Sequence, residues 1–280
     1  MKYVVSAETT IDLTNDLLDK YQIKTLPFSI LLGDKNYFDG EITCDDIIQF
    51  VNQTKILPKT GAVNKVQYDE HFDELLKDYD GIIHISLSSE LSSAYSNAVL
   101  SANERKNVFV IDSRTLSTGI ALLAIYAKEL IDEGSKLEDV YEKVLDRVPN
   151  TQVSFALNRV DYLYKGGRCS MLSYLGANLL KISPQLILKD GKMIAGKKFR
   201  GNFKHVVENY CNDILETYNT PDLSKVFITY TTSDQETLNM VENILKNRGF
   251  ENIYITRAGG TITSHCGENC LGILYMNDGK

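Results

Sequence analysis

A serine-rich run follows a predicted strand and precedes a predicted helix. The strand covers residues 81–86, and Ser88, Ser89, Ser92 and Ser93 come after it, with the helix starting near Ser92. A helix start presents unpaired backbone N–H groups and the positive end of the helix dipole. Hydroxyl groups at such a place can hold an anion such as a carboxylate or a phosphate. We expect Ser92 and Ser93 to contact a ligand of this kind, and the alternative is that Ser92 only caps the helix.

Two further segments carry side chains that can bind the same anion. Thr60 lies in a loop before another predicted helix and could supply a hydroxyl, although the loop also fits a simple turn with Asn64 as helix N-cap. Ser264 and His265 follow a predicted strand and lie near glycines. A histidine there can donate a hydrogen bond to an anion, and the alternative is a structural histidine.

Basic residues gather in one part of an acidic chain. The net charge is −7, yet residues 159–204 hold ten basic and two acidic side chains, a local charge of +8. Arg168 follows two glycines and Arg200 precedes one. Each guanidinium offers a fixed fork of donors that suits phosphate or carboxylate. We expect an anion-binding or partner-binding surface there, and the alternative is a solvated face.

Several familiar sites are missing from the sequence. No GxGxxG run, Walker A loop or G-x-S-x-G elbow occurs, which disfavours a Rossmann dehydrogenase, a P-loop kinase and an ordinary esterase. Among the five cysteines only Cys266 and Cys270 are close, and no second Cys/His pair completes a metal site with them. We therefore expect no metal and no cofactor.

The elements that must position these residues alternate between strands and helices in the first half of the chain. Strands are predicted at residues 3–5, 25–32, 81–86 and 107–111, and helices at 12–21, 43–53, from about 92, at 117–133 and at 136–148. Thr43 fits the N-cap of the second of these helices, with Asp46 in its first turn. The alternation predicts a parallel sheet with helices on both faces.

The second half predicts a different sheet. Strands are predicted at residues 152–156, 225–230 and 252–256, and helices at 202–218 and up to 247. Asp190-Gly191 between two apolar runs is typical of a hairpin with a type I′ turn. These patterns predict a mixed sheet in a C-terminal α/β domain of residues 151–280. A boundary near Pro149-Asn150 would end an N-terminal α/β domain of residues 1–150.

Length and composition indicate a globular protein. A chain of 280 residues, 43% hydrophobic and 24% charged, can bury a core without disulfides or metals. No segment reaches the ~18 uncharged apolar residues of a membrane span, and no signal peptide is recognised, so we expect a cytoplasmic protein. The acidic net charge and the lack of an aromatic-basic motif argue against nucleic-acid binding.

The order of these segments resembles the DegV family, the fatty-acid-binding proteins that serve as lipid-carrying subunits of bacterial fatty acid kinase. The shared segments are Asp39-Gly40, Thr60, Leu91-Ser92, Asp112-Ser113, residues 162–168, Asp190-Gly191, Arg200-Gly201 and Ser264-His265-x-Gly267. The resemblance implies a two-domain α/β protein that holds one long-chain fatty acid between its domains. It also implies that the chain has no catalytic residue of its own.

The resemblance assigns roles to single residues. It implies that Thr60 and Ser92 bind the carboxylate and that His265 lies close to this head group. Ser93 and Ser264, beside two of these positions, are expected at the ligand as well. The tail should supply most of the affinity, because burying roughly 14 methylenes at about 0.8 kcal/mol each contributes on the order of 11 kcal/mol.

The resemblance also implies a partner. Arg168 and Arg200 would form a charged rim that meets a kinase subunit or an acyl phosphate. The sequence departs from the family pattern at Ala7-Glu8, where the family has Asp-Ser, and at Glu268, where it has proline. A carboxylate at Glu268 would repel a fatty acid head group unless its side chain points away.

Two other functions fit the same residues. Ser92 or Ser93 could form a hydrolase triad with His265 and a carboxylate such as Asp112. The protein could also be a sensor of another anionic small molecule, which would need a small polar pocket rather than a long apolar channel.

Overall fold

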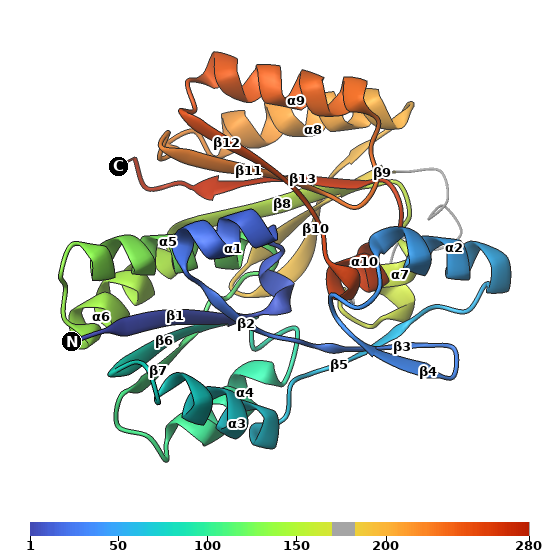
Figure 1. The fold of residues 1–280 in the computed structure, drawn as a ribbon. Coiled ribbons are helices and arrows are strands. Elements are labelled where there is room, and N and C mark those ends of the chain that lie inside the picture. The colour runs from blue at the N-terminus through green and yellow to red at the C-terminus, as the bar shows by residue number, and fades with distance from the viewer. Residues whose placement is uncertain (170–182, 280) are drawn as a thin grey trace.

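Two large sheets, with helices between and around them, form the main body of the protein (Figure 1). The computed structural model describes residues 1–169 and 183–279. A four-stranded sheet of order β2-β1-β6-β7 belongs to the N-terminal domain, and a six-stranded sheet of order β10-β9-β8-β13-β11-β12 belongs to the C-terminal domain. The first sheet is parallel and the second is mixed, as the sequence predicted.

The parallel sheet is covered on both faces. Its strands are β1 (Tyr3–Glu8), β2 (Lys24–Leu26), β6 (Gly81–Ser86) and β7 (Val108–Asp112). The helices around it are α1 (Asn15–Tyr21), α3 (Lys65–Leu75), α4 (Ala94–Ala102), α5 (Thr118–Asp132) and α6 (Leu137–Arg147). α3 and α4 lie on one side, and α5 and α6 on the other (Figure 1). All six residues of β6 are buried, as a strand between two helical layers requires.

The mixed sheet combines a parallel pair with antiparallel strands. Its strands are β8 (Thr151–Leu157), β9 (Ser183–Lys189), β10 (Lys192–Phe199), β11 (Lys225–Tyr230), β12 (Asn252–Arg257) and β13 (Cys270–Met276). Its outer face is covered by α8 (Phe203–Thr217) and α9 (Gln235–Arg248). β9 and β10 form the expected hairpin, and Asp190 and Gly191 have φ angles of 51° and 81°, as a type I′ turn requires.

The helix α5 joins the two sheets into one core. It contacts β1 and β6 on one side and β8, β11 and β13 on the other. Ten of its residues are buried, including the whole run from Thr118 to Ile125. A helix that is buried on both sides carries apolar residues all round rather than on one stripe. One hydrophobic cluster therefore reaches from β1 to β13. The division of the chain into domains of residues 1–150 and 151–280 stays a prediction.

A third, smaller sheet corrects one prediction. Residues 25–32 were expected to form one strand, but the structure divides them into β2 and β3 (Ser29–Leu32), which belong to different sheets. Pro27 lies between them, and proline has no N–H to donate to a strand ladder. β3 pairs antiparallel with β4 (Lys35–Phe38) and β5 (Lys59–Gly61), two short strands that the sequence analysis missed.

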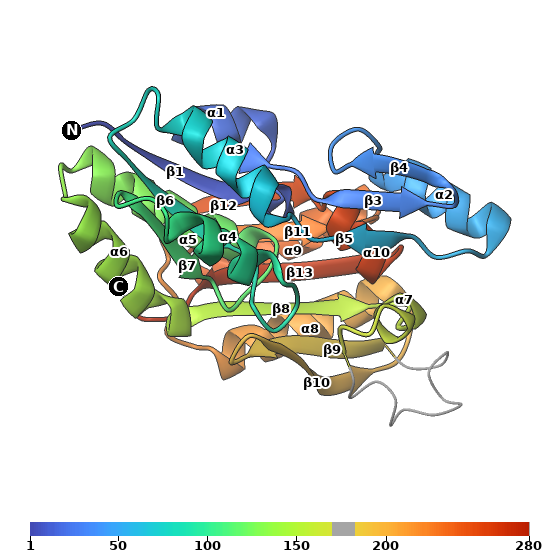
Figure 2. The ribbon, with the colours of Figure 1, turned by 90° about the horizontal axis from the view of Figure 1, so that it is seen from below.

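Three helices lie beside the small sheet (Figure 2). They are α2 (Cys44–Thr54), α7 (Asp161–Lys165) and α10 (Gly260–Cys266), and α10 contacts the other two as well as β3 and β5. Thr43 and Asp46 form a reciprocal capping box at the start of α2, which confirms the predicted N-cap. In the described part of the chain, no helix is long and apolar enough to cross a membrane.

Candidate functional site

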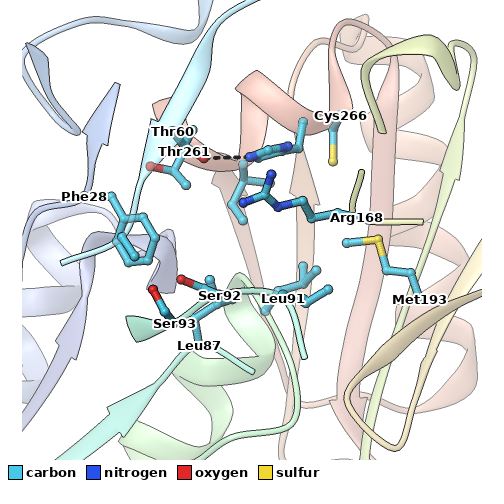
Figure 3. A pocket seen from close by; sticks show the side chains of 14 residues that line it. Phe28, Thr60, Leu87, Leu91, Ser92, Ser93, Arg168, Met193, Thr261 and Cys266 are labelled. Carbon is cyan, nitrogen blue, oxygen red and sulfur yellow. Dashed lines mark hydrogen bonds between the residues drawn. The ribbon is translucent and has the colours of Figure 1, made fainter. Parts of the chain in front are cut away.

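A cavity of about 170 Å³ lies between the two domains, beside the small sheet (Figure 3). Its polar lining residues are Thr60, Ser92, Ser93, Arg168, Thr261 and His265. Its other lining residues are Phe28, Ala62, Leu87, Leu91, Leu116, Met193, Ile262 and Cys266. We call this space the head-group cavity. The structure thus brings together four of the five residues that the sequence analysis expected at the ligand.

Thr60 and His265 meet in the wall of this cavity. Thr60 lies on β5, where it pairs with Ile30 of β3, and His265 lies on α10. The Thr60 Oγ1 atom and the His265 Nε2 atom are hydrogen-bonded at 2.8 Å, although the residues are 205 positions apart in the chain. Burial, together with the nearby charge of Arg168, lowers the pKa of His265 to about 4. The imidazole is therefore neutral at pH 7.

The lowered pKa of His265 predicts an acid-sensitive stability. A histidine in the unfolded chain takes up a proton near pH 6.5, whereas folded His265 does so only near pH 4. The free energy of unfolding should therefore fall as the pH drops from 6.5 towards 4. His265 should account for about 2 kcal/mol of this loss at pH 5. Urea unfolding at pH 7.5 and pH 5 measures it. Between these two pH values, His265→Gln should lose about 2 kcal/mol less unfolding free energy than the unchanged protein. An equal loss in the two proteins would contradict a buried, neutral His265.

Ser92 and Ser93 lie on the opposite side of the head-group cavity (Figure 3). The Ser92 Oγ atom accepts a hydrogen bond from the Ala94 N–H at 3.2 Å, so this hydroxyl still has its proton to donate. Ser93 is the N-cap residue of α4, yet its side chain makes no capping bond. Both hydroxyls, and the first-turn N–H groups of α4, can serve an anion in the cavity.

Thr261 is a lining residue that the sequence analysis missed. Its Oγ1 atom is buried and has no hydrogen-bond partner within the described residues. The Thr261 N–H donates to Asp39 Oδ2 at 3.0 Å, and the Gly260 N–H donates to Asp39 Oδ1 at 2.8 Å. Asp39 thereby ties the start of α10 to the loop before α2. The available signal was the Gly259-Gly260-Thr261 run after a predicted strand.

A second buried aspartate, Asp12, supports the same turn. Asp12 Oδ1 accepts from the Gly259 N–H at 2.8 Å, and Asp12 Oδ2 accepts from the Ser117 hydroxyl at 2.5 Å. Burial raises the pKa of Asp12 to about 8. Asp12 therefore links the N-terminal domain, the start of α5 and the start of α10 at a point close to the head-group cavity.

The other predicted residues lie outside this cavity or at its edge. Ser264 is buried on α10, and its hydroxyl donates to the Gly260 carbonyl at 2.7 Å. Arg168 is exposed and lines the cavity. Arg200 is exposed after the end of β10 and does not line it. Glu268 pairs with Arg159 at 3.3 Å and is not a lining residue, so it points away from the head-group cavity as a carboxylate ligand requires.

The two glycines before Arg168 have different roles. A Cβ atom on Gly166 would lie 2.8 Å from His265 Nδ1 and 2.9 Å from the Tyr162 carbonyl oxygen, whereas a Cβ on Gly167 would meet nothing within 4 Å. Gly167 instead has a φ angle of 70°, which favours glycine. Gly166 therefore lets α7 approach His265 closely, and Gly167 turns the chain towards Arg168.

The close approach at Gly166 predicts a specific defect. Gly166→Ala should push the His265 ring aside, at a cost of about 1–3 kcal/mol for overpacking. Histidine side-chain NMR signals report this displacement directly. Gly167→Ala is the control, because it strains the backbone without touching the ring. Unchanged His265 signals in Gly166→Ala would show that α7 moves instead.

Glu8, at one of the departures from the family pattern, is buried at the end of β1. It accepts hydrogen bonds from Tyr68 Oη, His84 Nε2, Ser86 Oγ and the Leu87 N–H. Burial by itself raises the pKa of Glu8, but the hydrogen bonds and the charge of His84 keep it below its usual value. Leu87 follows the end of β6 and lines the head-group cavity, so Glu8 holds part of the cavity wall in place through the Leu87 N–H.

A hydrolase triad is not assembled at this site. A triad needs a carboxylate on the histidine nitrogen that faces away from the nucleophile. His265 Nδ1 has no partner among the described residues, and its Nε2 atom bonds Thr60 rather than a serine. Asp112 instead accepts from Ser89 and Arg114. The hydrolase alternative is therefore disfavoured by the geometry.

Comparison with known proteins identifies the family. The family model described as "Uncharacterised protein, DegV family" matches residues 2–278. The chain belongs to the DegV family. The resemblance seen in the order of the sequence segments is thereby confirmed. A DegV domain-containing protein of Clostridium acetobutylicum is 32% identical over 206 residues, which cover 72% of this chain and 74% of that protein.

Relatives with stated functions share the whole DegV architecture. A Thermotoga maritima protein named "Fatty acid-binding protein" is 29% identical over 284 residues, covering 97% of this chain and 96% of its own. The structure of a T. maritima protein described as revealing fatty acid binding function has a TM-score of 0.85 and 26% identity, and covers 99% of both chains. A Thermus thermophilus DegV protein, 24% identical, has the same fold with a TM-score of 0.90 over 99% of this chain and 100% of that one.

Proposed function

We propose that this DegV protein binds one long-chain fatty acid, with its carboxylate at Thr60, Ser92 and His265. The observation that carries the proposal is a second, narrower cavity next to the head-group cavity. Leu116, Ile262 and Cys266 line both spaces, so the two are neighbours that share a wall. An amphipathic ligand fits this order, with polar groups at one end and an apolar passage at the other.

This second cavity, called the passage below, is where we place the acyl tail. Beyond the shared wall it is lined by apolar groups of the mixed sheet, among them Phe155, Cys270 and Leu274. Its volume is about 20 Å³, so a tail must move side chains as it enters. The head-group cavity itself offers hydroxyls from three elements, β5, the start of α4, and α10. Thr261 and Ser93 add two hydroxyls to the proposed carboxylate site, since neither has a hydrogen-bond partner among the described residues.

The named functions of the relatives support this ligand. Both T. maritima proteins described above are named for fatty acid binding, and neither is named as an enzyme. A ligand of this class needs no catalytic residue in the chain that carries it, which agrees with the unassembled triad around His265.

Mass spectrometry of an organic extract tests the proposal. The purified protein should release about one equivalent of a long-chain fatty acid, and a control protein purified alongside should release none. The dominant chain length in the extract would identify the preferred tail. An empty extract, together with no uptake of fatty acid on incubation, would contradict the proposal. If short-chain acids then displaced a bound anion, the protein would instead be a sensor of a small anion.

We further propose that the bound acid is presented to a fatty acid kinase for acyl-phosphate formation. Arg168 is exposed at the mouth of the head-group cavity, and Arg200 lies in the same strongly basic part of the sequence. Such a rim suits a partner that carries phosphate or acidic groups. The test incubates the loaded protein with a fatty acid kinase and ATP. Acyl phosphate should form, and it should form more slowly with Arg168→Gln and Arg200→Gln while the lipid stays bound.

A further inference from the structure

A third space, separate from the head-group cavity and from the passage, lies next to the Thr60–His265 pair. It has a volume of about 410 Å³ and lies at the surface beside α7 and the segment before β5. Thr60, Arg168 and His265 line both this pocket and the head-group cavity, so they form the wall between the two. A pocket of this size is large enough for a small ligand, because ligand pockets commonly measure roughly 300–1,000 Å³. We call it the basic pocket.

The charge of the basic pocket has one sign. Lys55, Lys59, Lys165 and Arg168 line it, and no aspartate or glutamate of the described residues does. None of the four cations forms an ion pair with a residue in ranges 1–169 and 183–279. Among the residues that the structure describes, Lys55 Nζ and Arg168 Nη1 bond only to the backbone carbonyls of Asn52 and Gly166, respectively. All four side chains are exposed, so water weakens each interaction, but four like charges around one space still favour the entry of an anion.

The wall of the basic pocket holds an unused polar atom. His265 Nδ1 is buried without a hydrogen-bond partner among the described residues, and it lies against Gly166, which lines this pocket. The Nε2 atom of the same ring bonds Thr60, which lines both spaces. The neutral ring therefore connects the proposed carboxylate site on one side with the basic pocket on the other.

The number of cations favours a particular anion. A carboxylate carries one charge and two oxygens, and the head-group cavity already offers it hydroxyl donors. A phosphate group carries up to two charges and three or four oxygens, which matches three ammonium groups and one guanidinium fork. Two segments far apart in the sequence, one with Lys55 and Lys59 and the other with Lys165 and Arg168, line this one space.

We propose that the basic pocket is a phosphate-binding site formed by Lys55, Lys59, Lys165 and Arg168. Its ligand is either free phosphate or a phosphoryl group carried by the compound in the head-group cavity. The second source rests on the proposed function, because it needs an acyl compound at Thr60 and Ser92. The first source does not.

Two titrations at constant ionic strength test this site. The first adds inorganic phosphate to the full-length protein, and the second compares hexadecylphosphonate with hexadecanoate. The test variant is Lys59→Gln/Lys165→Gln. The control is Lys24→Gln/Lys35→Gln, which removes the same charge from exposed positions on β2 and β4. Fatty acid content is measured in every protein.

The expected result is a loss confined to the pocket variant. Saturable phosphate binding that weakens about tenfold or more in Lys59→Gln/Lys165→Gln, and is kept in the control, supports the free-phosphate source. Tighter binding of hexadecylphosphonate than of hexadecanoate supports the phosphoryl source, provided that this difference disappears in Lys59→Gln/Lys165→Gln and is kept in the control. Neither signal, or equal losses in both variants, overturns the site. Fatty acid content is measured separately from phosphate binding. A protein without fatty acid would therefore reject the proposed function, while the titration with inorganic phosphate would still decide whether the phosphate site exists.

Discussion

Replacing Thr60 and Ser92 together by alanine is expected to release the bound fatty acid from a protein that stays folded. The Ser92 hydroxyl can donate to a carboxylate, and the Thr60 hydroxyl can do so when His265 Nε2 carries the ring proton and donates to Thr60 Oγ1. Hydrogen bonds to charged groups contribute about 1.5–3 kcal/mol each. The pair should therefore weaken binding by about 3–6 kcal/mol, or roughly 10²- to 10⁴-fold. Both residues are only partly buried, so the loss of fold stability should be much smaller.

Fatty acid occupancy and thermal unfolding measure the two effects separately. Thr220→Ala/Ser233→Ala removes a threonine and a serine hydroxyl that do not line the head-group cavity, and it should keep the ligand. Unchanged occupancy in Thr60→Ala/Ser92→Ala would mean that the carboxylate lies elsewhere. Thr261 would then be the next candidate, because its buried hydroxyl has no partner within the described chain.

Ile262→Phe should change which fatty acids bind. Ile262 lines both the head-group cavity and the narrow passage beyond it, so a larger side chain there obstructs the path of the tail. If about six methylenes are kept out of the passage, a long-chain acid loses on the order of 5 kcal/mol at about 0.8 kcal/mol each. Octanoate, which has fewer methylenes to place in the passage, should lose much less affinity.

Competition between octanoate and hexadecanoate measures this effect. The matched control is Ile255→Phe, the same substitution on β12, where the side chain is exposed and lines neither space. Retained octanoate binding also shows that Ile262→Phe has not unfolded the protein, although overpacking costs about 1–3 kcal/mol. An unaltered preference for chain length would place the tail outside the passage between α10 and the mixed sheet.

Elements whose signals are local could be predicted from the sequence. The capping box of Thr43 with Asp46 and the Asp190-Gly191 turn each depend on residues within a few positions of one another. Asn64 likewise caps α3 through Gln67, as the simple-turn alternative expected, while Thr60 four residues earlier lines the cavity. The capping interpretation of that loop is therefore confirmed, and the ligand role of Thr60 stays a prediction.

Elements that depend on distant partners could not be predicted in this way. β4 and β5 have few apolar residues and exist because β3 pairs with both of them. Thr261 carries no motif of its own, and it becomes a lining residue because Asp39, 222 positions away, holds its N–H. Ser264 lies next to His265 in the sequence, yet its hydroxyl is directed to the Gly260 carbonyl within α10.

The sequence by itself determined the fold class, the family and most of the hydroxyl groups at the candidate site. These follow from hydrophobic periodicity, turn residues and the order of short motifs, which are written along the chain. The tertiary structure alone decided that Thr60 and His265 share a hydrogen bond and that the basic pocket lies behind them. It also decided the low pKa of His265. The physical reason is that desolvation and electrostatic interaction depend on the groups packed around a residue, and those groups come from distant parts of the chain.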